Sequence, residues 1–300
     1  MLNMEPSSDQ LRTLAAVVEH GTFDRAAAAL HLTPSAVSQR IKSLEELSGR
    51  VLVRRSKPIQ ATAAGAVLVR LARQVALLEA EAAAELEGDD PAAGILAPAS
   101  VPLVVNADSL ATWVLPALAT LPGSVFDIVL DDQEHTIGRL RDGTAMAAIG
   151  SDREPVQGCT VTALGSMRYR PLASPAFVER WCPDGWSART AAAAPMLVYD
   201  RKDALQDRYL GRFAPGARPP RQYVPASTEF VAAAALGLGW GMIPDLQAEP
   251  LIADGRLVVL DEDGAEDVPL YWQQWSLQSA ALTAVAEAIA RAAATALRPA

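Results

Sequence analysis

One stretch decides the fold of the N-terminal part of this chain: residues 22–65 read TFDRAAAALHLTPSAVSQRIKSLEELSGRVLVRRSKPIQATAAG. Thr33 followed by Pro34 is typical of a helix start. A threonine side chain there accepts a hydrogen bond from a free backbone N–H, and proline has its φ already set for the first turn. We expect this helix to run to about Leu47 and to end at Gly49, since glycine readily adopts the left-handed conformation that stops a helix.

Two more helices are predicted before this one. A capping box at Ser7–Gln10 starts the first, which ends at Gly21, and Thr22 caps a short, alanine-rich helix over Phe23–Leu30. Three short helices with a tight turn between the second and the third indicate a helix-turn-helix. On pattern alone, a small three-helix bundle with a solvated polar face stays open as the alternative.

The third helix has an apolar and a polar face. Val37, Ile41 and Leu44 recur at helical spacing and predict its buried face. The opposite face carries hydroxyl, amide and ammonium groups, which are the side-chain types that contact base edges and phosphates in a major groove. The members of this polar face are Ser35, Ser38, Gln39 and Lys42.

A basic hairpin is predicted after the third helix. Val51–Val53 is strand-like, residues 54–58 form a turn, and Ile59–Ala61 can return as the second strand. Three cationic side chains near the tip suit contact with phosphates or with a minor groove. A solvated hairpin without a partner is the alternative reading.

Taken together, these residues resemble the DNA-binding domain of the LysR-type transcriptional regulators. The shared pattern is AAxxLxxTPSAVSQxIxxLExxxG, followed by LVxR in the hairpin and TxAG at the next helix start. The resemblance implies a mainly α-helical winged helix-turn-helix whose third helix enters the major groove of double-stranded promoter DNA. The residues it assigns to DNA are Thr33, Pro34, Ser35, Ser38, Gln39 and Lys42 on the helix, and Arg54, Arg55 and Lys57 in the wing.

A long helix is predicted from Ala63 to about Leu86, capped by Thr62. Its apolar residues recur at a spacing close to 3.5, which is typical of a seam between paired helices; packing on the same chain is the alternative. The seam consists of Val67, Leu71, Val75, Leu78 and Ala82. The family resemblance implies a linker-helix homodimer, which can assemble further into a homotetramer, and RNA polymerase as a further partner.

The charge of the chain is divided unevenly. The whole sequence has 26 Lys and Arg against 35 Asp and Glu, a formal net charge of −9. Residues 1–87 are neutral and residues 88–300 carry the whole excess, while residues 33–60 are net +4. The acidic average therefore does not argue against a DNA-binding segment. We find no apolar run of transmembrane length, no signal peptide and no zinc spacing for the two cysteines, so we expect a cytoplasmic protein without membrane contact.

Strands and helices alternate in the C-terminal two-thirds, which predicts parallel α/β layers. Ligands of such sheets bind beyond the carboxyl ends of the strands, near helix N-termini. The predicted strands are Leu103–Ala107, Phe126–Leu130, Ala145–Ile149, Met196–Tyr199, Gln222–Val224 and Trp240–Ile243, and we expect helices after Asp108, from about Lys202 and from about Thr228.

The family resemblance implies that this part is an α/β effector domain of two lobes, of the periplasmic-binding-protein type, with a small ligand in the cleft between them. A hinge is expected after the linker helix, over residues 88–100. The expected organisation is a DNA-binding domain over 1–61, a linker helix and hinge over 62–100, and an effector domain over 101–300, with lobe one at about 102–159 plus 265–300 and lobe two at about 160–264.

Three further segments resemble one branch of this family, the ArgP/LysG-type regulators of lysine and arginine export. They are VNADSLATW at Val105–Trp113, DDQEHT at Asp131–Thr136 and YWQQW at Tyr271–Trp275. The branch implies lysine, arginine or histidine as effector and activation of an amino-acid exporter gene. Two alternatives are a LysR-type regulator with another small effector and a DNA-binding inhibitor of replication initiation, to which some branch members are linked.

Acidic residues follow the first two strands of the effector domain, where a ligand is expected. A cationic side chain in a partly desolvated cleft needs carboxylate partners. Its α-carboxylate can accept N–H groups at helix starts near Ser109 or near Ser227 and Thr228. Simple N-caps and solvated loop charges are the alternative explanation. The candidate effector-binding residues are Asp108, Ser109, Thr112, Trp113, Asp132, Glu134, Ser227, Thr228 and Glu229, with Asp131 beside them.

Catalytic and cofactor motifs give weaker signals. Gly237–Gly241 lacks the third glycine and the distant acid of a dinucleotide-binding loop, and Glu134 with His135 lacks a second histidine for a metal site. Neither a GxSxG elbow nor a Cys–His pair is present in the sequence. We therefore expect no enzyme, no cofactor and no metal.

Overall fold

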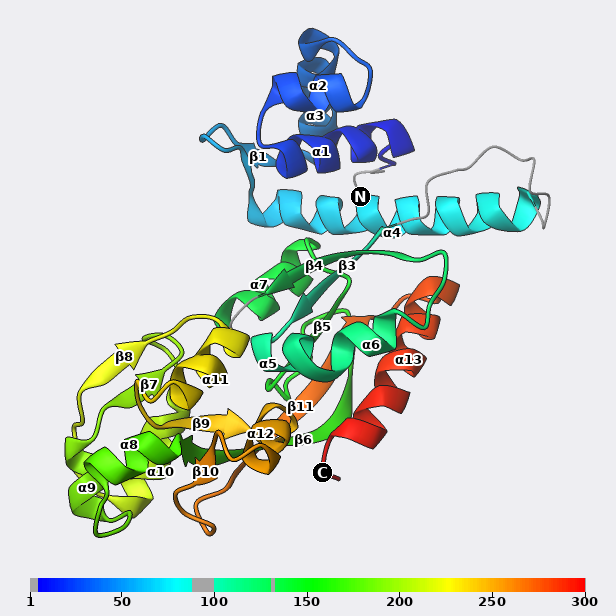
Figure 1. The fold of residues 1–300 in the computed structure, drawn as a ribbon. Helices are drawn as coiled ribbons and strands as arrows, with labels where there is room; N and C mark the ends of the chain where they lie inside the picture. The colour runs from blue at the N-terminus through cyan, green and yellow to red at the C-terminus, as the bar shows by residue number, and fades with distance from the viewer. Residues whose placement is uncertain (1–4, 88–99, 131–132, 300) are drawn as a thin grey trace.

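The computed structural model describes residues 5–87, 100–130 and 133–299. A small helical domain sits above a long helix, and a two-lobed α/β domain lies on the other side of that helix (Figure 1).

The N-terminal domain confirms the predicted three-helix order, with α1 at Ser8–His20, α2 at Phe23–Ala29 and α3 at Pro34–Ser48. The side chains of the residues before each helix, Ser7, Thr22 and Thr33, all accept a hydrogen bond from a backbone N–H in the first turn. These caps are local, so the sequence pattern was sufficient to find them.

The wing is shorter than predicted. It consists of β1 at Val53–Arg54 and β2 at Gln60–Ala61, paired antiparallel. Arg54 therefore lies in a strand and not in the turn. Gly65, two residues into the next helix, approaches the wing so closely that a Cβ there would lie 1.9 Å from the carbonyl oxygen of Leu52. Only glycine allows this helix to start directly against the hairpin.

The linker helix α4 runs over Ala63–Glu87, and the Oγ1 of Thr62 caps it by accepting the N–H of Gly65 at 3.0 Å. Leu68, Val69 and Ala72 pack into the core of the N-terminal domain, whereas Leu77 is buried in the core of the effector domain. Most of the predicted seam faces outward: Val67 and Leu78 are 55% and 41% exposed. The helix therefore contacts both domains with one side and presents an apolar stripe on another.

One seven-stranded sheet runs through the effector domain. Its order is β10-β6-β11-β5-β3-β4, and β9 pairs with β6 outside this path. The strands β5, β3 and β4, at one end of the sheet, are parallel, as predicted. The parallel expectation is wrong for the predicted strand that becomes β9, which pairs antiparallel with β6. The other antiparallel strands, β6, β10 and β11, were not among the predicted strands, and β6 and β11 are the long strands that run between the lobes. The strands span Ser100–Val105 (β3), Val125–Leu130 (β4), Ala147–Gly150 (β5), Cys159–Ala173 (β6), Gly241–Pro244 (β9), Val258–Val259 (β10) and Glu266–Trp275 (β11).

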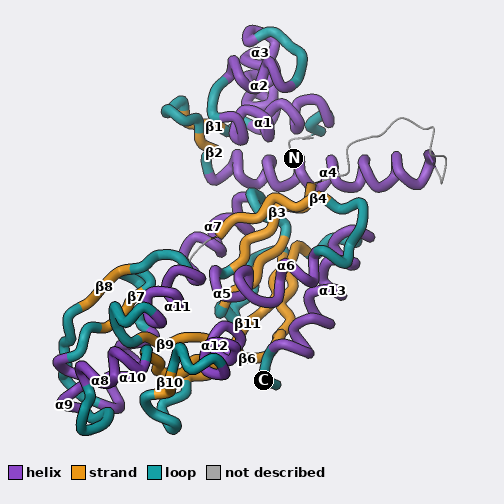
Figure 2. The backbone as a smooth tube through the Cα atoms, viewed as in Figure 1, coloured by secondary structure: helices purple, strands orange, loops and turns teal. Residues whose placement is uncertain are grey.

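Helices divide the effector domain into two lobes joined by β6 and β11 (Figure 2). Lobe one carries α5 at Ala107–Ser109, a π-helical turn at Leu110–Val114, α6 at Leu115–Leu118, α7 at Gln133–Asp142 and α13 at Ala280–Ala296. Lobe two carries α8 at Pro175–Trp181, α9 at Ala188–Ala193, α10 at Leu205–Phe213, α11 at Ser227–Ala235 and α12 at Asp245–Ala253, with the parallel pair β7 at Met196–Val198 and β8 at Arg221–Tyr223.

Two helix starts differ from the prediction. The residue before α5 is Asn106, so Asp108 lies in the first turn and does not cap the helix. Helix α10 begins at Leu205 and not near Lys202, because the intervening residues form a turn around two aspartates.

Candidate functional site

The polar face of α3 is free to meet a partner. Val37, Ile41 and Leu44 are buried against the domain core, as predicted. Of the residues assigned to DNA on this helix, Ser38 is half-buried and Thr33, Pro34, Ser35, Gln39 and Lys42 are exposed. Thr33 also has a structural role, because its Oγ1 accepts the N–H of Ala36 at 3.2 Å.

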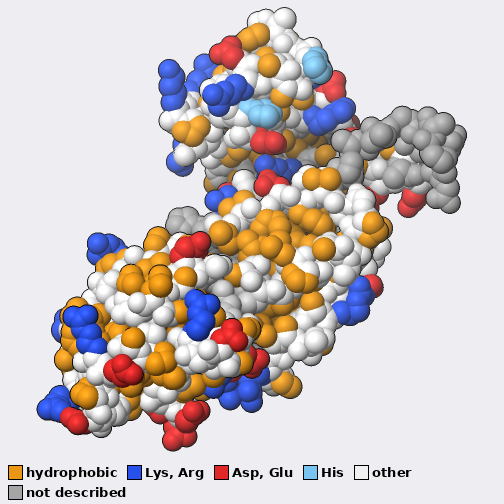
Figure 3. Space-filling model, viewed as in Figure 1, with side chains coloured by type: hydrophobic (Ala, Val, Ile, Leu, Met, Phe, Trp, Pro, Cys, Tyr) orange, Lys and Arg blue, Asp and Glu red, His pale blue; other side chains and the backbone are white. Residues whose placement is uncertain are grey.

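The wing presents its cations to solvent. Arg54, Arg55 and Lys57 are all exposed. The hairpin is held to the end of α1 by a hydrogen bond from the N–H of Ile59 to the carbonyl of Gly21, at 2.9 Å. Figure 3 shows Lys and Arg side chains gathered along one flank of the N-terminal domain. A fixed helix and a cationic hairpin side by side suit a major groove and the phosphates next to it.

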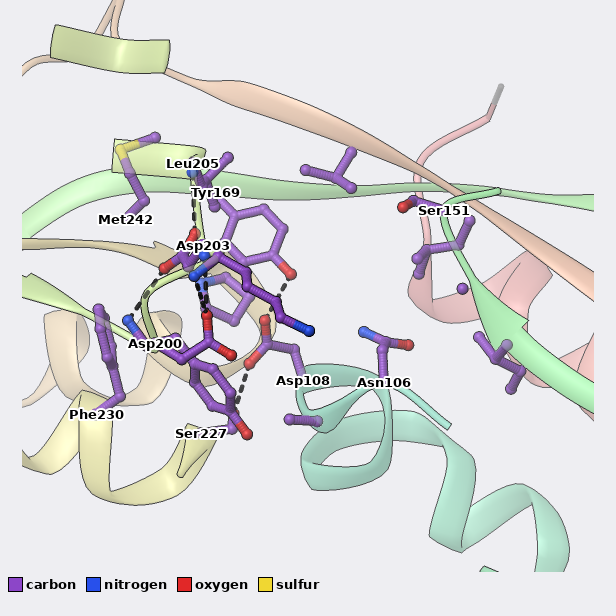
Figure 4. A pocket seen from close by; sticks show the side chains of 18 of the residues that line it. Asn106, Asp108, Ser151, Tyr169, Asp200, Asp203, Leu205, Ser227, Phe230 and Met242 are labelled. Carbon is purple, nitrogen blue, oxygen red and sulfur yellow. Dashed lines mark hydrogen bonds between the residues drawn. The ribbon is translucent and has the colours of Figure 1, made fainter. Parts of the chain in front are cut away.

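A second site lies between the two lobes of the effector domain, where a cavity of about 490 Å³ opens beyond β3 and β5. Lobe one contributes Asn106, Asp108 and Asp152 to its lining, and lobe two contributes Asp200 and Ser227. Figure 4 shows that side chains of both lobes point toward one another across this space. Its position beyond the carboxyl ends of β3 and β5 agrees with the rule for parallel sheets.

Asp108 connects three parts of the fold. Its Oδ2 accepts a hydrogen bond from the hydroxyl of Tyr169 on β6, and its Oδ1 accepts one from the Oγ of Ser227 on α11, both at 2.6 Å (Figure 4). Burial raises the pKa of Asp108, and these two hydrogen bonds oppose that shift. The carboxylate is therefore a polar link between the lobes in the wall of the cavity.

Two aspartates of lobe two also line the cavity. Asp203 accepts the N–H groups of Tyr199 and Leu205 at 3.1 and 2.9 Å, which closes the turn before α10. Asp200 accepts the N–H groups of Lys202 and Asp203 at 2.7 and 2.9 Å. Sequence reasoning missed this pair, although two aspartates three residues apart after a strand are a known turn and capping signal.

Gln273 on β11 holds the loop after β5 that brings Asp152 into the cavity lining. Its Nε2 donates to the carbonyls of Asp152 and Glu154 at 3.0 and 3.1 Å, and its Oε1 accepts the N–H of Val156 at 3.2 Å. Burial raises the pKa of Asp152, and the charge of Glu154 adds to this shift. One buried amide thus fixes the loop that carries a cavity carboxylate.

The described lining of the cavity is acidic. Four aspartates stand against two basic residues, Lys202 and Arg208. Three buried polar atoms of the lining have no hydrogen-bond partner: Asn106 Oδ1, Ser151 Oγ and Gln206 Oε1. Buried acceptors without partners are costly unless a ligand satisfies them. The cavity therefore suits a small ligand that carries positive charge and several hydrogen-bond donors.

The structure brings two of the predicted effector-binding residues, Asp108 and Ser227, into the cavity lining. Four others lie elsewhere. Ser109 is fully buried and Trp113 packs in the core, because the turn of the helix directs both into lobe one. Thr228 and Glu229 are exposed, because the first turn of α11 rotates them away from the cavity.

Four further candidate residues are absent from the described cavity lining. Thr112 is half-buried outside the lining. Its Oγ1 donates a hydrogen bond to the carbonyl of Asp108 at 2.6 Å, which helps to fix the backbone position of Asp108. Asp131 and Asp132 lie outside the described residues. Glu134 belongs to α7, but its side chain lies outside the described part of the structure.

Within residues 5–87, 100–130 and 133–299, His, Cys, Asp and Glu side chains form no group suited to hold a metal ion. None of the helices in the same ranges is long and apolar enough to cross a membrane.

A winged helix-turn-helix joined by a long helix to a two-lobed ligand-binding domain defines a class of DNA-binding regulators with a small-molecule effector. Comparison with known families agrees. Residues 8–66 match the bacterial regulatory helix-turn-helix proteins of the lysR family, and residues 101–294 match the LysR substrate binding domain. The chain belongs to the LysR family.

Individual relatives are similar over nearly the whole chain. The transcriptional regulator LysG of Mycobacterium tuberculosis strain H37Rv is 47% identical, over 99% of this chain and 96% of the relative. The lysine export transcriptional regulatory protein LysG of Corynebacterium glutamicum is 41% identical, over 97% of this chain and 99% of the relative. The solved full-length structure of the latter with bound effector Arg superposes with a TM-score of 0.78 at 39% identity, covering 98% of this chain and all of that one.

Proposed function

We propose that this protein is a LysR-type transcriptional regulator that senses lysine or arginine and controls transcription of an amino-acid exporter gene. The acidic, acceptor-rich cavity carries this proposal. A basic amino acid has net charge +1 and complements a lining in which aspartates outnumber basic residues, while a dicarboxylate such as glutamate does not. One relative supports the same conclusion twice: the Corynebacterium glutamicum LysG is named as a lysine export regulator, and its solved structure holds arginine as effector.

The effector would bind in the cleft between the lobes. Asp108, Asp152 and Asp200 offer carboxylates for the two cationic groups of the ligand. The basic residues of the lining, with the N-terminus of α11 at Ser227, offer partners for its α-carboxylate. Of the residues predicted for this task, Asp132 and Glu134 stay predictions, and no cofactor or metal is part of the proposal.

Regulation would follow from closure of the lobes on the ligand. The exposed stripe of α4 fits a second copy of the same helix, so the regulator would act as a homodimer or homotetramer that binds promoter DNA in the cytoplasm and contacts RNA polymerase. We assign residues 1–61 to DNA binding, 62–100 to the linker and 101–300 to the effector domain, with the two lobes as expected from the sequence.

Isothermal titration calorimetry on the full-length protein tests this proposal. Lysine or arginine should bind, and glutamate should bind at least about tenfold more weakly. Transcription in vitro from an exporter promoter, with and without the bound amino acid, should show the regulatory effect. Equal affinity for glutamate and arginine would refute the acidic cavity as a sensor of basic amino acids.

A further inference from the structure

Two arginines of the linker helix α4, Arg70 and Arg73, lie one turn apart and donate hydrogen bonds to loops of the effector domain. Arg73 donates a hydrogen bond to the carbonyl of Gly143, in the turn between α7 and β5. Burial lowers the pKa of Arg73, and the charges of Glu19 on α1 and Asp142 on α7 oppose this shift. This guanidinium therefore lies where the DNA-binding domain, the linker helix and the effector domain meet.

Arg70 reaches a different loop. Its Nη1 donates to the carbonyl of Gln157 at 3.1 Å, and a Cβ at Gly158 would lie 3.6 Å from the same nitrogen. The backbone of α4 also lies against the turn between α7 and β5, where a Cβ at Gly143 would lie 2.7 Å from the Cα of Arg70. The effector domain and α4 therefore touch without intervening side chains at this point.

The loop that Arg70 grips begins in the cavity. Residues 151–158 connect β5 to β6, and Ser151 and Asp152 at its start line the ligand cavity. The side chain of Gln273 makes three hydrogen bonds along this loop, and Val156 is buried beneath it. A loop tied at this many points moves as a unit, so a displacement at its start is carried to its end.

A second contact holds the far part of α4. The carboxylate of Glu81 accepts hydrogen bonds from the Oγ of Ser279 and from the N–H of Ala281, at 3.0 Å for the latter, and so caps the N-terminus of α13. Leu77, one turn earlier, is buried in the effector-domain core. The helix is thus held at both ends of its contact, and a shift of the loop under Arg70 would tilt it against this fixed point.

We propose that loop 151–158 transmits ligand binding from the cavity directly to the linker helix, with Gln273 as the anchor at the cavity end and Arg70 as the anchor at the helix end. The coupling rests on the proposed function, because it needs a ligand in the cavity. It adds a route from the effector to the DNA-binding domain that passes through the contact between α4 and the effector domain and does not require the segment that links them along the chain.

Hydrogen–deuterium exchange of the full-length protein, with and without saturating arginine, tests the coupling. In the unsubstituted protein, arginine should change the exchange rate of α4 amides by about twofold or more. Arg70→Ala should still bind arginine, measured by calorimetry, but should lose at least about half of the change in α4. Gln273→Met, measured at arginine concentrations that saturate this variant, should lose the same response.

Arg291→Ala is the matched control, since Arg291 is an exposed arginine of α13 whose ion pair is with Glu287 on the same helix. The Arg291→Ala variant should show the same arginine-dependent change in α4 exchange as the unsubstituted protein.

A full arginine response of α4 in Arg70→Ala would overturn the coupling, as would a constant α4 exchange in an unsubstituted protein that binds arginine. In both cases the proposed function stands. If calorimetry detects no basic amino acid bound to the unsubstituted protein, the proposed function itself fails, and the coupling with it. If Gln273→Met does not fold, the α4 exchange of Arg70→Ala with and without arginine tests the coupling by itself.

Discussion

The hydroxyl of Ser227 donates a hydrogen bond to the carboxylate of Asp108 at 2.6 Å, although the two residues lie 119 positions apart in the chain. One belongs to the first turn of α11 in lobe two and the other to the first turn of α5 in lobe one. This bond joins the lobes in the wall of the ligand cavity, so its strength contributes to how closed the cleft is.

Asp108→Asn should weaken arginine binding by about tenfold or more, because a neutral amide loses the charge that favours a cation and forms weaker hydrogen bonds with the two hydroxyls. Calorimetry measures the affinity. Glu229→Gln is the matched control, since it removes one carboxylate from α11 at an exposed position outside the cavity lining. A similar loss in both variants would mean that overall charge, and not the position of Asp108, determines the affinity.

Arg54→Ala should reduce the salt dependence of DNA binding. Each phosphate contact that a cation makes releases counterions, so the slope of log K against log salt concentration should fall by about one. Fluorescence anisotropy with a promoter fragment at several salt concentrations measures this slope. Arg201→Ala, an arginine of lobe two that stacks on Tyr223, should leave it unchanged. An unchanged slope in Arg54→Ala would remove this wing residue from the interface.

Gly143→Ala should destabilise the protein more than Gly216→Ala. Both glycines have nearly the same left-handed backbone, with φ of 79° and 80°, so an alanine is strained to a similar degree at either position, by about 1–3 kcal/mol. At Gly143 the new Cβ would also meet the backbone of Arg70, whereas nothing lies within 4 Å at Gly216. Thermal unfolding measures the difference. Equal losses of stability would mean that α4 moves aside to make room for the Cβ at position 143 at no cost in free energy.

Asp267→Asn should lower stability at neutral pH and not in acid. Arg168 donates two hydrogen bonds to this carboxylate, at 2.8 and 2.6 Å, and this holds the pKa of Asp267 below its usual value. A lowered folded-state pKa contributes stability above the unfolded value of 3.8, and this stability is lost as the pH falls through the folded value. Since Asp267 is 40% exposed, screening limits the effect to about 1 kcal/mol or less. Urea unfolding at a series of pH values from 7 downward measures it: the difference between the two proteins should shrink as the pH falls below 3.8, and a difference that stays constant over this range would contradict the electrostatic origin.

The N-terminal domain was predictable almost to the residue, because short-range chemistry decides it. Thr33 caps α3 and Gly49 ends it in the structure, as expected. The wing was less predictable. Its strands contain two residues each, and their length depends on how Gly65 of the next helix packs against Leu52.

The candidate ligand site was predicted only in part. Asp108 and Ser227 could be found because each follows a strand in a parallel α/β pattern. Asp152 and Gln273 could not, since no local pattern relates residues 121 positions apart; the pairing of β11 with its neighbours brings them together. Glu229 was included for its charge, but the helical turn directs it to solvent.

The sequence by itself determined the class of this protein: a helix-turn-helix with a cationic wing, a long helix with an apolar seam, and an acidic α/β domain. Caps, periodicity and charge are properties of neighbouring residues, so they can be read along the chain. Only the tertiary structure decided which carboxylates share the cavity, that Asp108 links the two lobes, and that Arg70 touches the loop leading from the ligand site. These relations depend on the crossing of β6 and β11 between the lobes, which sets contacts between residues that are distant in sequence.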